Sequence, residues 1–434
     1  MTQRRDSTFK DTTMENGRQD GMQDGIRDAE EKTLVGMDAH SARVSLCVTR
    51  WRKGGEPRVI REISTDLGGL EATYAGNVPK GALTVLEAST NSFAIVRRLE
   101  AAGHEARVLT SDALSGMSRP DRVNDRIDAR NLAFAYAGGG TRRVHVPAPE
   151  YARLRDIWFG YRNAVKDTAR WSNRLWGFCS MRGLDLPKRS PRLKVDGIRA
   201  AVKGKAWEGD DAFHAEMMLA EYAHARETRA AYERKIEETV AGNRDMALAM
   251  QVKGVRYIVA FALAAFIEDV RRFATAKKLA AYVGLNPGVA DSGKAEKRRH
   301  VSRYGRGDLK SLMVEAAQSA LNKDDAGMHR RARRKLASGK ERNAVVCALA
   351  RKMLCHLWHI LMGHPCPWAE PEALFRRKLS ALARKVGKEK MKGLGHESAA
   401  EFVEGVIAGI RRHDAGCAAA GTPQPQPQRN SISA

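Results

Sequence analysis

The chain has 434 residues, enough for two to four domains, and 43% of them are hydrophobic, so substantial cores can form. Its 75 Lys and Arg against 51 Asp and Glu leave a net charge of +24, which attracts polyanions and predicts nucleic acid as a partner, although a basic surface can also be merely solvated. No apolar run is long enough for a membrane span, and the polar N-terminus lacks the apolar core of a signal peptide, so we expect a cytoplasmic, nucleoid-associated protein.

The N-terminal third alternates between short apolar runs and helix-like stretches. After a polar tail at 1–31, which we expect to be disordered, a domain is predicted at 32–147. Its predicted strands are 33–38, 43–48, 58–64, 82–87 and 106–109, and its predicted helices are 67–75, 92–102 and 122–136. Three strands followed by helix, strand, helix, strand and helix is the order of an α/β ribonuclease H-like (RuvC-like) domain, whose first three strands form a meander.

Four acidic residues of this domain are placed where they can converge. Asp38 ends the first strand, and Glu87 ends the fourth, an apolar run typical of a buried central strand. Asp125 and Asp128 are three residues apart on one face of the last helix. Carboxylates gathered at one sheet edge repel each other unless a cation neutralises them, and oxygen ligands suit Mg²⁺ or Mn²⁺. Each acid alone could be an ordinary cap or surface residue, but together they predict a metal-dependent phosphodiester site.

Arginines surround the last two of these acids in the sequence. The four that flank them are Arg119, Arg122, Arg126 and Arg130. Guanidinium groups in this setting fit contacts to the phosphates of a nucleic acid. They could equally balance the charge of the acids, and both roles can hold together.

The segment 148–250 is predicted to be a basic helical spacer. Residues 151–182 and 209–244 have helical character and could form a coiled coil, although the heptad signal is weak, whereas 187–205 is expected to be a basic loop. Among its tryptophans are Trp158, Trp171 and Trp176, which we expect to pack between helices rather than to stack on bases.

The segment 251–365 is predicted to be a compact helical domain. Its expected helices are 257–267, 273–283, 309–321 and a basic helical stretch at 325–362, with a break at 284–288 and a turn at 291–294. Residues 366–434 are expected to be a tail, first basic and then of low complexity in the Pro-Gln repeat at 423–428.

Ser292 lies in the predicted turn and is a second candidate for chemistry. The neighbouring Gly293 would let the backbone approach a phosphate closely, and nearby basic residues could stabilise a phosphorane-like charge. These basic residues are Lys294, Arg298 and Arg299. Because Asp-Ser-Gly-Lys is also a common surface turn, the local sequence alone favours a turn without catalytic function.

The cysteines predict neither a disulfide framework nor a clear metal site. The six are Cys47, Cys179, Cys347, Cys355, Cys366 and Cys417, scattered without a CxxC pair. Cys355, Cys366 and three nearby histidines, His356, His359 and His364, include zinc-ligand types, but the cluster lies on an apolar helix-like stretch at 344–362 and lacks the usual paired spacing. Packing is therefore the favoured interpretation, and zinc is the alternative.

Several motifs in order resemble one known family. They are Val35–Asp38, Leu86–Ser89, Asn124–Arg130 and the stretch from Gly254 to Leu321, which contains Leu279–Pro287, Ser292-Gly293 and Tyr304-Gly305. Over 33–362 the chain resembles the DEDD-type insertion-sequence transposases of the IS one-ten group, which are related to the Piv-type DNA invertases. It departs from their pattern at Lys253, where the family usually has Pro, at Arg256, often a small residue, and at Asn124, where Thr is common.

The resemblance implies more than the residues alone do. It implies a RuvC-like domain whose tetrad, Asp38, Glu87, Asp125 and Asp128, holds Mg²⁺ or Mn²⁺. It implies that Ser292 is the nucleophile that becomes covalently joined to DNA. It also implies a structured bridge RNA that pairs with donor and target DNA, and a homodimer or homotetramer with composite sites.

The function expected from the sequence is therefore that of a DNA transposase or recombinase, which excises and inserts its element on double-stranded DNA under the guidance of a bridge RNA. One alternative is a RuvC-like junction resolvase or nuclease, in which metal-activated water attacks and Ser292 is only part of a turn. The other is a nucleic-acid-binding protein without catalytic activity, which the complete set of four acids disfavours.

Overall fold

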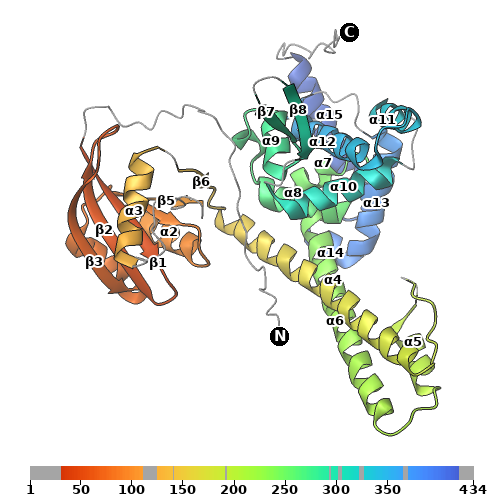
Figure 1. Cartoon of the computed structure of the whole chain (residues 1–434). Helices are drawn as coiled ribbons and strands as arrows, with labels where there is room; N and C mark the ends of the chain where they lie inside the picture. Colours follow the sequence, from red (N-terminus) through yellow and green to blue (C-terminus); the bar gives the residue numbers. More distant parts are fainter. Residues whose placement is uncertain are drawn as a thin grey trace. The chain divides into compact units, whose positions relative to one another are not determined.

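The computed structural model describes residues 31–110, 125–139, 141–190, 193–292, 295–301, 305–321, 327–364 and 370–419, with the backbone alone for 288–301 and 410–419 (Figure 1). The expected tail at 1–31 lies outside these residues except for its last position. The chain divides into two compact units. The first combines 1–148 with 277–311, and the second combines 149–276 with 312–434.

The first unit contains a six-stranded mixed sheet in the order β3-β2-β1-β4-β5-β6. The strands are β1 (Lys32–Ala39), β2 (Arg43–Trp51), β3 (Arg58–Asp66), β4 (Leu83–Glu87), β5 (Glu105–Leu109) and β6 (Arg143–Val144). The first three strands form an antiparallel meander, and β1 then pairs in parallel with β4, and β4 with β5. The meander and the five longer strands were expected from the sequence, whereas the short β6 was not.

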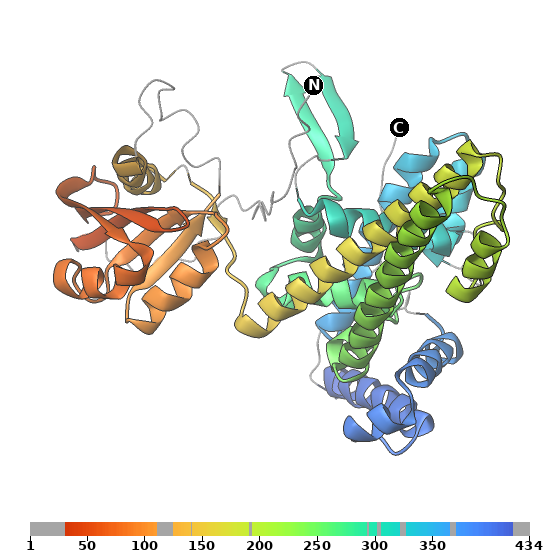
Figure 2. The ribbon, with the colours of Figure 1, turned by 90° about the horizontal axis from the view of Figure 1, so that it is seen from below.

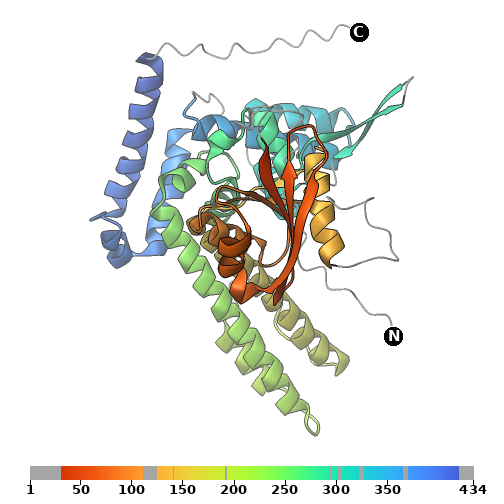
Figure 3. The same ribbon diagram turned by 90° about the vertical axis from the view of Figure 1, so that its left-hand side faces the viewer.

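Helices cover both faces of this sheet, as Figures 2 and 3 show. The short η1 (Leu67–Gly69) leads into α1 (Leu70–Asn77), and α2 (Ser92–Ala101) follows β4; α3 (Asp125–Ala137) covers the opposite face. Side chains of a strand alternate between faces, so β1 serves both cores: Val35 packs in the cluster with α1 and α2, and Leu34 in the cluster with α3. An α/β domain is thus confirmed, and its assignment to the ribonuclease H-like fold stays a prediction.

The second unit begins with two long antiparallel helices that pack along each other (Figure 1). They are α4 (Pro149–Met181) and α6 (Asp211–Ala241). Gly160 permits close packing, because a Cβ there would overlap the ring of Tyr232. Trp158 is 2% exposed, and Trp171 and Trp176 pack against the cluster at the far end of the pair, so the expected packing role of the tryptophans is confirmed.

The expected loop at 187–205 is wrong for its second half, where the structure has α5 (Val195–Lys203). Ile198 and Val202 are four residues apart and both are buried against α4 and α6, in a cluster with Leu175 and Leu219. The spacing of Ile198 and Val202 is that of one helical face, but the many Lys and Arg residues of 187–205 concealed this signal in the sequence.

The rest of the second unit is helical. It contains α7 (Arg244–Ala249), α8 (Tyr257–Ile267), η2 (Val270–Arg272), α11 (Gly327–Ala337) and α12 (Arg342–Leu361), while α9 (Ala276–Val283) and α10 (Gly307–Leu321) extend across the boundary between the units. By length and composition α12 could cross a membrane. Nine of its side chains are buried in the unit, as expected of a core helix. A mainly helical region after the sheet domain is therefore confirmed.

The expected tail at 366–434 is also wrong over much of its length. Residues 372–419 contain three helices, α13 (Glu372–Val386), α14 (Lys388–Gly393) and α15 (Ala399–Ala419). Phe375, Leu379 and Phe402 are at most 2% exposed, because α13 packs against both α15 and α6. The basic residues between these apolar positions concealed the helical periodicity, and 420–434, with the Pro-Gln repeat, lie outside the described residues.

The chain on either side of the expected turn forms a β-hairpin (Figure 2), while positions 293 and 294 of that turn lie outside the described residues. Its strands are β7 (Pro287–Ser292) and β8 (Ala295–Val301), and Ser292 pairs with Ala295 across the tip. Neither strand was expected, because residues 287–301 show no alternation of apolar and polar side chains.

Candidate metal and nucleic-acid site

The parallel pairing of β1 and β4 aligns Asp38 with Glu87. Met37 is paired with Leu86, so each acid is the next residue of its strand at the same edge of the sheet. Side chains alternate between the two faces along each strand, so residues an even number of positions apart share a face. Leu34 and Val85 belong to the core beneath α3. Asp38 lies four residues after Leu34, and Glu87 lies two residues after Val85. Both carboxylates therefore lie on the face of the sheet that α3 covers.

Gly36 brings α3 close to this edge. A Cβ at position 36 would overlap the carbonyl oxygen of Ala129 and lie 2.9 Å from the backbone nitrogen of Ala133. The helix backbone thus rests directly on β1. The first turn of α3 carries Asp125 and Asp128, so the absence of a side chain at Gly36 is what allows these acids to reach the strand-end acids.

We expect Gly36→Ala to separate α3 from β1. Overpacking of this kind costs about 1–3 kcal/mol of stability or more, because the clash is with backbone and cannot be relieved by a rotamer change. Thermal unfolding should show a lower melting temperature, and metal affinity should fall. Gly76→Ala is the control, since a Cβ there has no atom within 4 Å; an equal loss of stability in both variants would contradict the packing argument.

The four acids influence one another electrostatically. Burial raises the pKa of Asp38; His40 opposes this, and Asp125 and Asp128 raise it further. Burial also raises the pKa of Glu87, with added repulsion from Asp38 and Asp128. Like charges that lie close together favour a cation that neutralises them, and carboxylate oxygens are the donors that a hard divalent ion takes. The residues present therefore fit a magnesium or manganese site.

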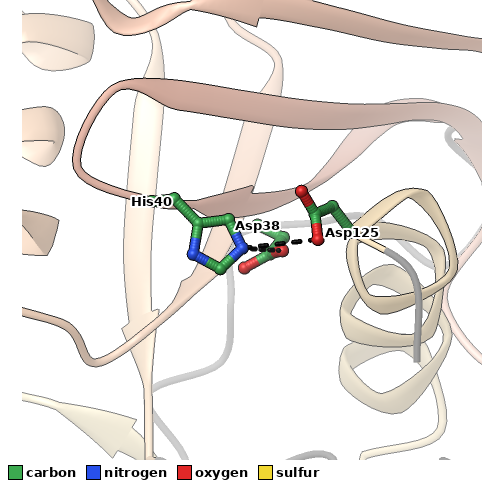
Figure 4. Close-up of side chains that lie close together, drawn as sticks. All are labelled: Asp38, His40 and Asp125. Atoms are coloured by element: carbon green, nitrogen blue, oxygen red, sulfur yellow. Dashed lines mark ion pairs between the residues drawn. The ribbon is translucent and has the colours of Figure 1, made fainter.

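His40 joins this set and was not singled out from the sequence. Its Nε2 lies 3.2 Å from Oδ2 of Asp38 and 3.5 Å from Oδ1 of Asp125 (Figure 4). Among the described residues, these three form the one group of His, Cys, Asp and Glu side chains whose ligand atoms all lie within 4.8 Å of one another. The available signal was the spacing, because a residue two positions after Asp38 extends on the same side of the chain.

The arginines expected to contact phosphates are only partly described. Arg126 and Arg130 are exposed on α3, beside Asp125 and Asp128, and the guanidinium of Arg130 lies over the ring of Phe134. Arg119 and Arg122 lie outside the described residues. Helix α3 therefore carries two exposed arginines as well as two of the four acids.

The serine candidate lies at the end of β7, and only its backbone is described. Arg298 pairs with Val289 and Arg299 with Gly288 on the opposite strand, while Lys294 lies outside the described residues. Ser292 and these basic residues are therefore neighbours along one hairpin.

The Cys and His residues near the end of α12 take part in packing. Nε1 of Trp358 donates to the carbonyl of Phe273 at 3.0 Å, and Nδ1 of His359 lies 3.3 Å from Nδ1 of His364. Burial lowers the pKa of His356 to about 4, so this ring is neutral. Cys355 is near the carbonyl of Ala276, and Cys366 lies outside the described residues.

Several known proteins that are similar to this chain are named as transposases. Residues 246–333, from α7 to α11, match the family described as "Transposase IS116/IS110/IS902 family". A probable family 20 transposase of Pseudomonas aeruginosa is 25% identical over 291 residues, which cover 65% of this chain and 85% of the relative. The transposase for insertion sequence element IS1111A of Coxiella burnetii is 21% identical over 350 residues, 77% of this chain and 91% of the relative.

A putative transposase of Sinorhizobium fredii, y4rJ, is 25% identical over 373 residues, which cover 76% of this chain and 94% of the relative. These relatives are all named transposases, and one of them is named for an insertion sequence element. The matched segment is similar to the IS116/IS110/IS902 family. The resemblance drawn from the sequence motifs is confirmed to this extent, and its metal, serine and RNA details stay predictions.

Proposed function

We propose that the protein is a DNA transposase that excises an insertion sequence and inserts it by cleaving and rejoining DNA strands. The observation that supports the proposal is that Asp38 and Glu87 lie side by side at the ends of β1 and β4, on the face covered by α3, whose first turn carries Asp125 and Asp128. The similarity to named transposases supports DNA as the substrate.

The tetrad would hold Mg²⁺ or Mn²⁺ and orient the scissile phosphate. A bound divalent ion supplies Lewis-acid polarisation of the phosphoryl oxygen and stabilises charge on the attacking and leaving oxygens. The protein contributes a fixed frame for it: β1 and β4 hold Asp38 and Glu87 in register, and α3 holds the other two acids. Arg126 and Arg130 on the same helix would contact the neighbouring phosphates.

Ser292 would be the nucleophile in this reaction. Its oxygen forms a new ester bond to phosphorus while the bond from phosphorus to one sugar oxygen breaks. The serine hydroxyl proton passes to solvent, and the sugar oxygen takes up a proton from solvent and leaves as a hydroxyl. The number of phosphate ester bonds stays the same, so a free DNA hydroxyl can reverse the step and rejoin a strand. Lys294, Arg298 and Arg299 would stabilise the charge that develops. This role rests on the resemblance and on the position of Ser292 in the hairpin.

The basic surface of α11 and α12 supports nucleic acid as the partner. Helix α11 has no acidic residue and exposes Arg331, Arg334 and Lys335. The pKa of Lys352 on α12 is lowered by burial and by the nearby charges of Arg331 and Lys335. Like charges held this close favour a polyanion that neutralises them.

We expect the double variant Arg331→Glu/Lys335→Glu to bind nucleic acid more weakly. The slope of log affinity against log salt should become shallower by about 0.9 for each phosphate that the variant no longer neutralises. Fluorescence anisotropy over a salt series measures both quantities. The control Arg234→Glu/Lys235→Glu makes the same charge change on an exposed part of α6 that also carries acids; equal weakening in the two variants would show a general charge effect instead.

A strand-exchange assay tests the proposed function. The protein is expressed with its native flanking DNA, purified, and incubated with DNA carrying the element ends and a target, with Mg²⁺ or with a chelator. We expect joined recombinant strands only with the ion. Cleaved ends without joining would favour a junction resolvase or nuclease, and absence of any turnover would favour a nucleic-acid-binding protein.

The guide RNA and the assembly are part of the same proposal. Sequencing of the RNA that copurifies should give one discrete RNA encoded beside the gene, because the resemblance implies that base pairing rather than protein side chains selects the target. Heterogeneous RNA would count against guidance. Light scattering should give a homodimer or homotetramer, and a monomer on DNA would contradict composite sites.

A further inference from the structure

We propose that His40 is itself a ligand of the metal held by Asp38 and Asp125, and that its nitrogen gives the site a preference for Mn²⁺ over Mg²⁺. The inference rests on the proposed metal-dependent function and adds to it a fifth, non-acidic residue. Its starting observation is the group of three ligand atoms within 4.8 Å, which joins an imidazole nitrogen to two carboxylates from different elements (Figure 4).

The distances suit ligands of one ion. Two donors at right angles around an octahedral ion with bonds of 2.0–2.1 Å are separated by about 3 Å. Nε2 of His40 is 3.2 Å from the Asp38 oxygen and 3.5 Å from the Asp125 oxygen. A single ion can therefore be reached by all three atoms with small side-chain movements.

The backbone holds His40 at this position. Its N–H donates to the carbonyl of Arg43 at 2.9 Å, which closes the turn between β1 and β2. Its carbonyl accepts from Nδ2 of Asn91 at 2.9 Å, and Oδ1 of Asn91 accepts in turn from Ser89. The turn is thus tied to the segment that follows β4. The ring, 60% exposed, is presented to the solvent side of the acidic set.

The nitrogen donor changes which ion is favoured. Mg²⁺ demands oxygen ligands and gives up its water reluctantly, so an imidazole adds little to its binding. First-row transition ions accept imidazole nitrogen as well as carboxylate oxygen, which makes Mn²⁺ the hard ion that gains from a mixed set. A tetrad of carboxylates alone would discriminate less between the two ions.

Pulsed electron paramagnetic resonance of Mn²⁺ bound to the full chain tests the assignment directly. With one equivalent of Mn²⁺ and no nucleic acid, we expect nitrogen modulation from a directly bound imidazole, and its pattern should change when histidine is labelled with ¹⁵N. His40→Ala should lose this modulation, and its Mn²⁺ dissociation constant should rise about tenfold or more while that for Mg²⁺ changes little. His224→Ala, an exposed histidine on α6, is the matched control.

The outcomes separate the two proposals. Asp38→Asn should remove the bound ion whether or not His40 is a ligand. If the wild-type protein binds neither ion, the proposed metal-dependent function fails. If it binds Mn²⁺ without nitrogen modulation, or if His40→Ala keeps the modulation, only the assignment of His40 is overturned. The wild-type spectrum decides the matter even if a variant does not fold.

Discussion

Replacing Asp38 or Asp125 with asparagine is expected to abolish strand cleavage while leaving the fold intact. Asparagine keeps the shape of aspartate but removes a negative charge from the set that would bind the ion. Mutations of groups that only support a metal ligand commonly cost 10–100-fold, so loss of a ligand should cost more than about 100-fold. The measurement is the rate of strand cleavage at saturating DNA and Mg²⁺.

The Asp38→Asn variant should lose strand cleavage without losing stability. Burial and neighbouring charges raise the pKa of this carboxyl. A raised pKa in the folded state means that the native protein binds the proton more tightly, so the metal-free protein loses stability as pH rises from 3.8, the ordinary value for Asp, through the raised value. Asp38→Asn has no such charge to bury. Its free energy of unfolding at neutral pH, without metal, should equal or exceed that of the wild type.

The combination of these two results is specific. A structural defect would lower both activity and stability, whereas loss of a metal ligand lowers activity alone. Asp156→Asn, at an exposed position on α4, should leave cleavage unchanged. Full metal-dependent cleavage by Asp38→Asn or Asp125→Asn would contradict the role of the tetrad. Added Mg²⁺ should raise the melting temperature of the wild type but not of Asp38→Asn.

The acidic set could be predicted because its positions follow from short-range rules. Apolar runs mark β1 and β4, and an acid directly after such a run lies at the strand end. The spacing of Asp125 and Asp128 fixes their common face. None of this requires knowledge of distant contacts. The register of β1 and β4 cannot be read from the sequence. In the structure it pairs Met37 with Leu86 and so places Asp38 and Glu87 side by side, as expected.

The features that were missed depend on tertiary contact. Gly36 is informative only when the backbone of α3 is known to rest on it, and His40 only when Asp125 arrives from another element. The strands β7 and β8 lack an apolar alternation, so their mutual pairing is their only signal. Helix α5 has two buried apolar residues, too few to outweigh its basic neighbours before α4 and α6 are in place.

Ser292→Ala is expected to eliminate covalent protein–DNA adducts and strand exchange while leaving DNA binding unchanged. Alanine lacks the oxygen that would form the bond to phosphorus, so the variant cannot form the adduct through this residue even slowly. The measurement uses end-labelled DNA, denaturing gels to detect label that stays with the protein, and anisotropy for binding. Ser311→Ala on α10, whose hydroxyl donates to the carbonyl of Gly307, is the matched control.

The pattern of products identifies the nucleophile whichever way the experiment ends. If the serine attacks, the wild type gives adducts that need both Ser292 and the tetrad, and Asp38→Asn gives none although its serine is present. If activated water attacks, the wild type and Ser292→Ala release the same free ends, and only the tetrad variants are inactive. Adducts that persist in Ser292→Ala would mean that another hydroxyl reacts, and the hairpin would then have no part in the chemistry. The tetrad is needed in every case, so the two variants together separate the metal site from the nucleophile.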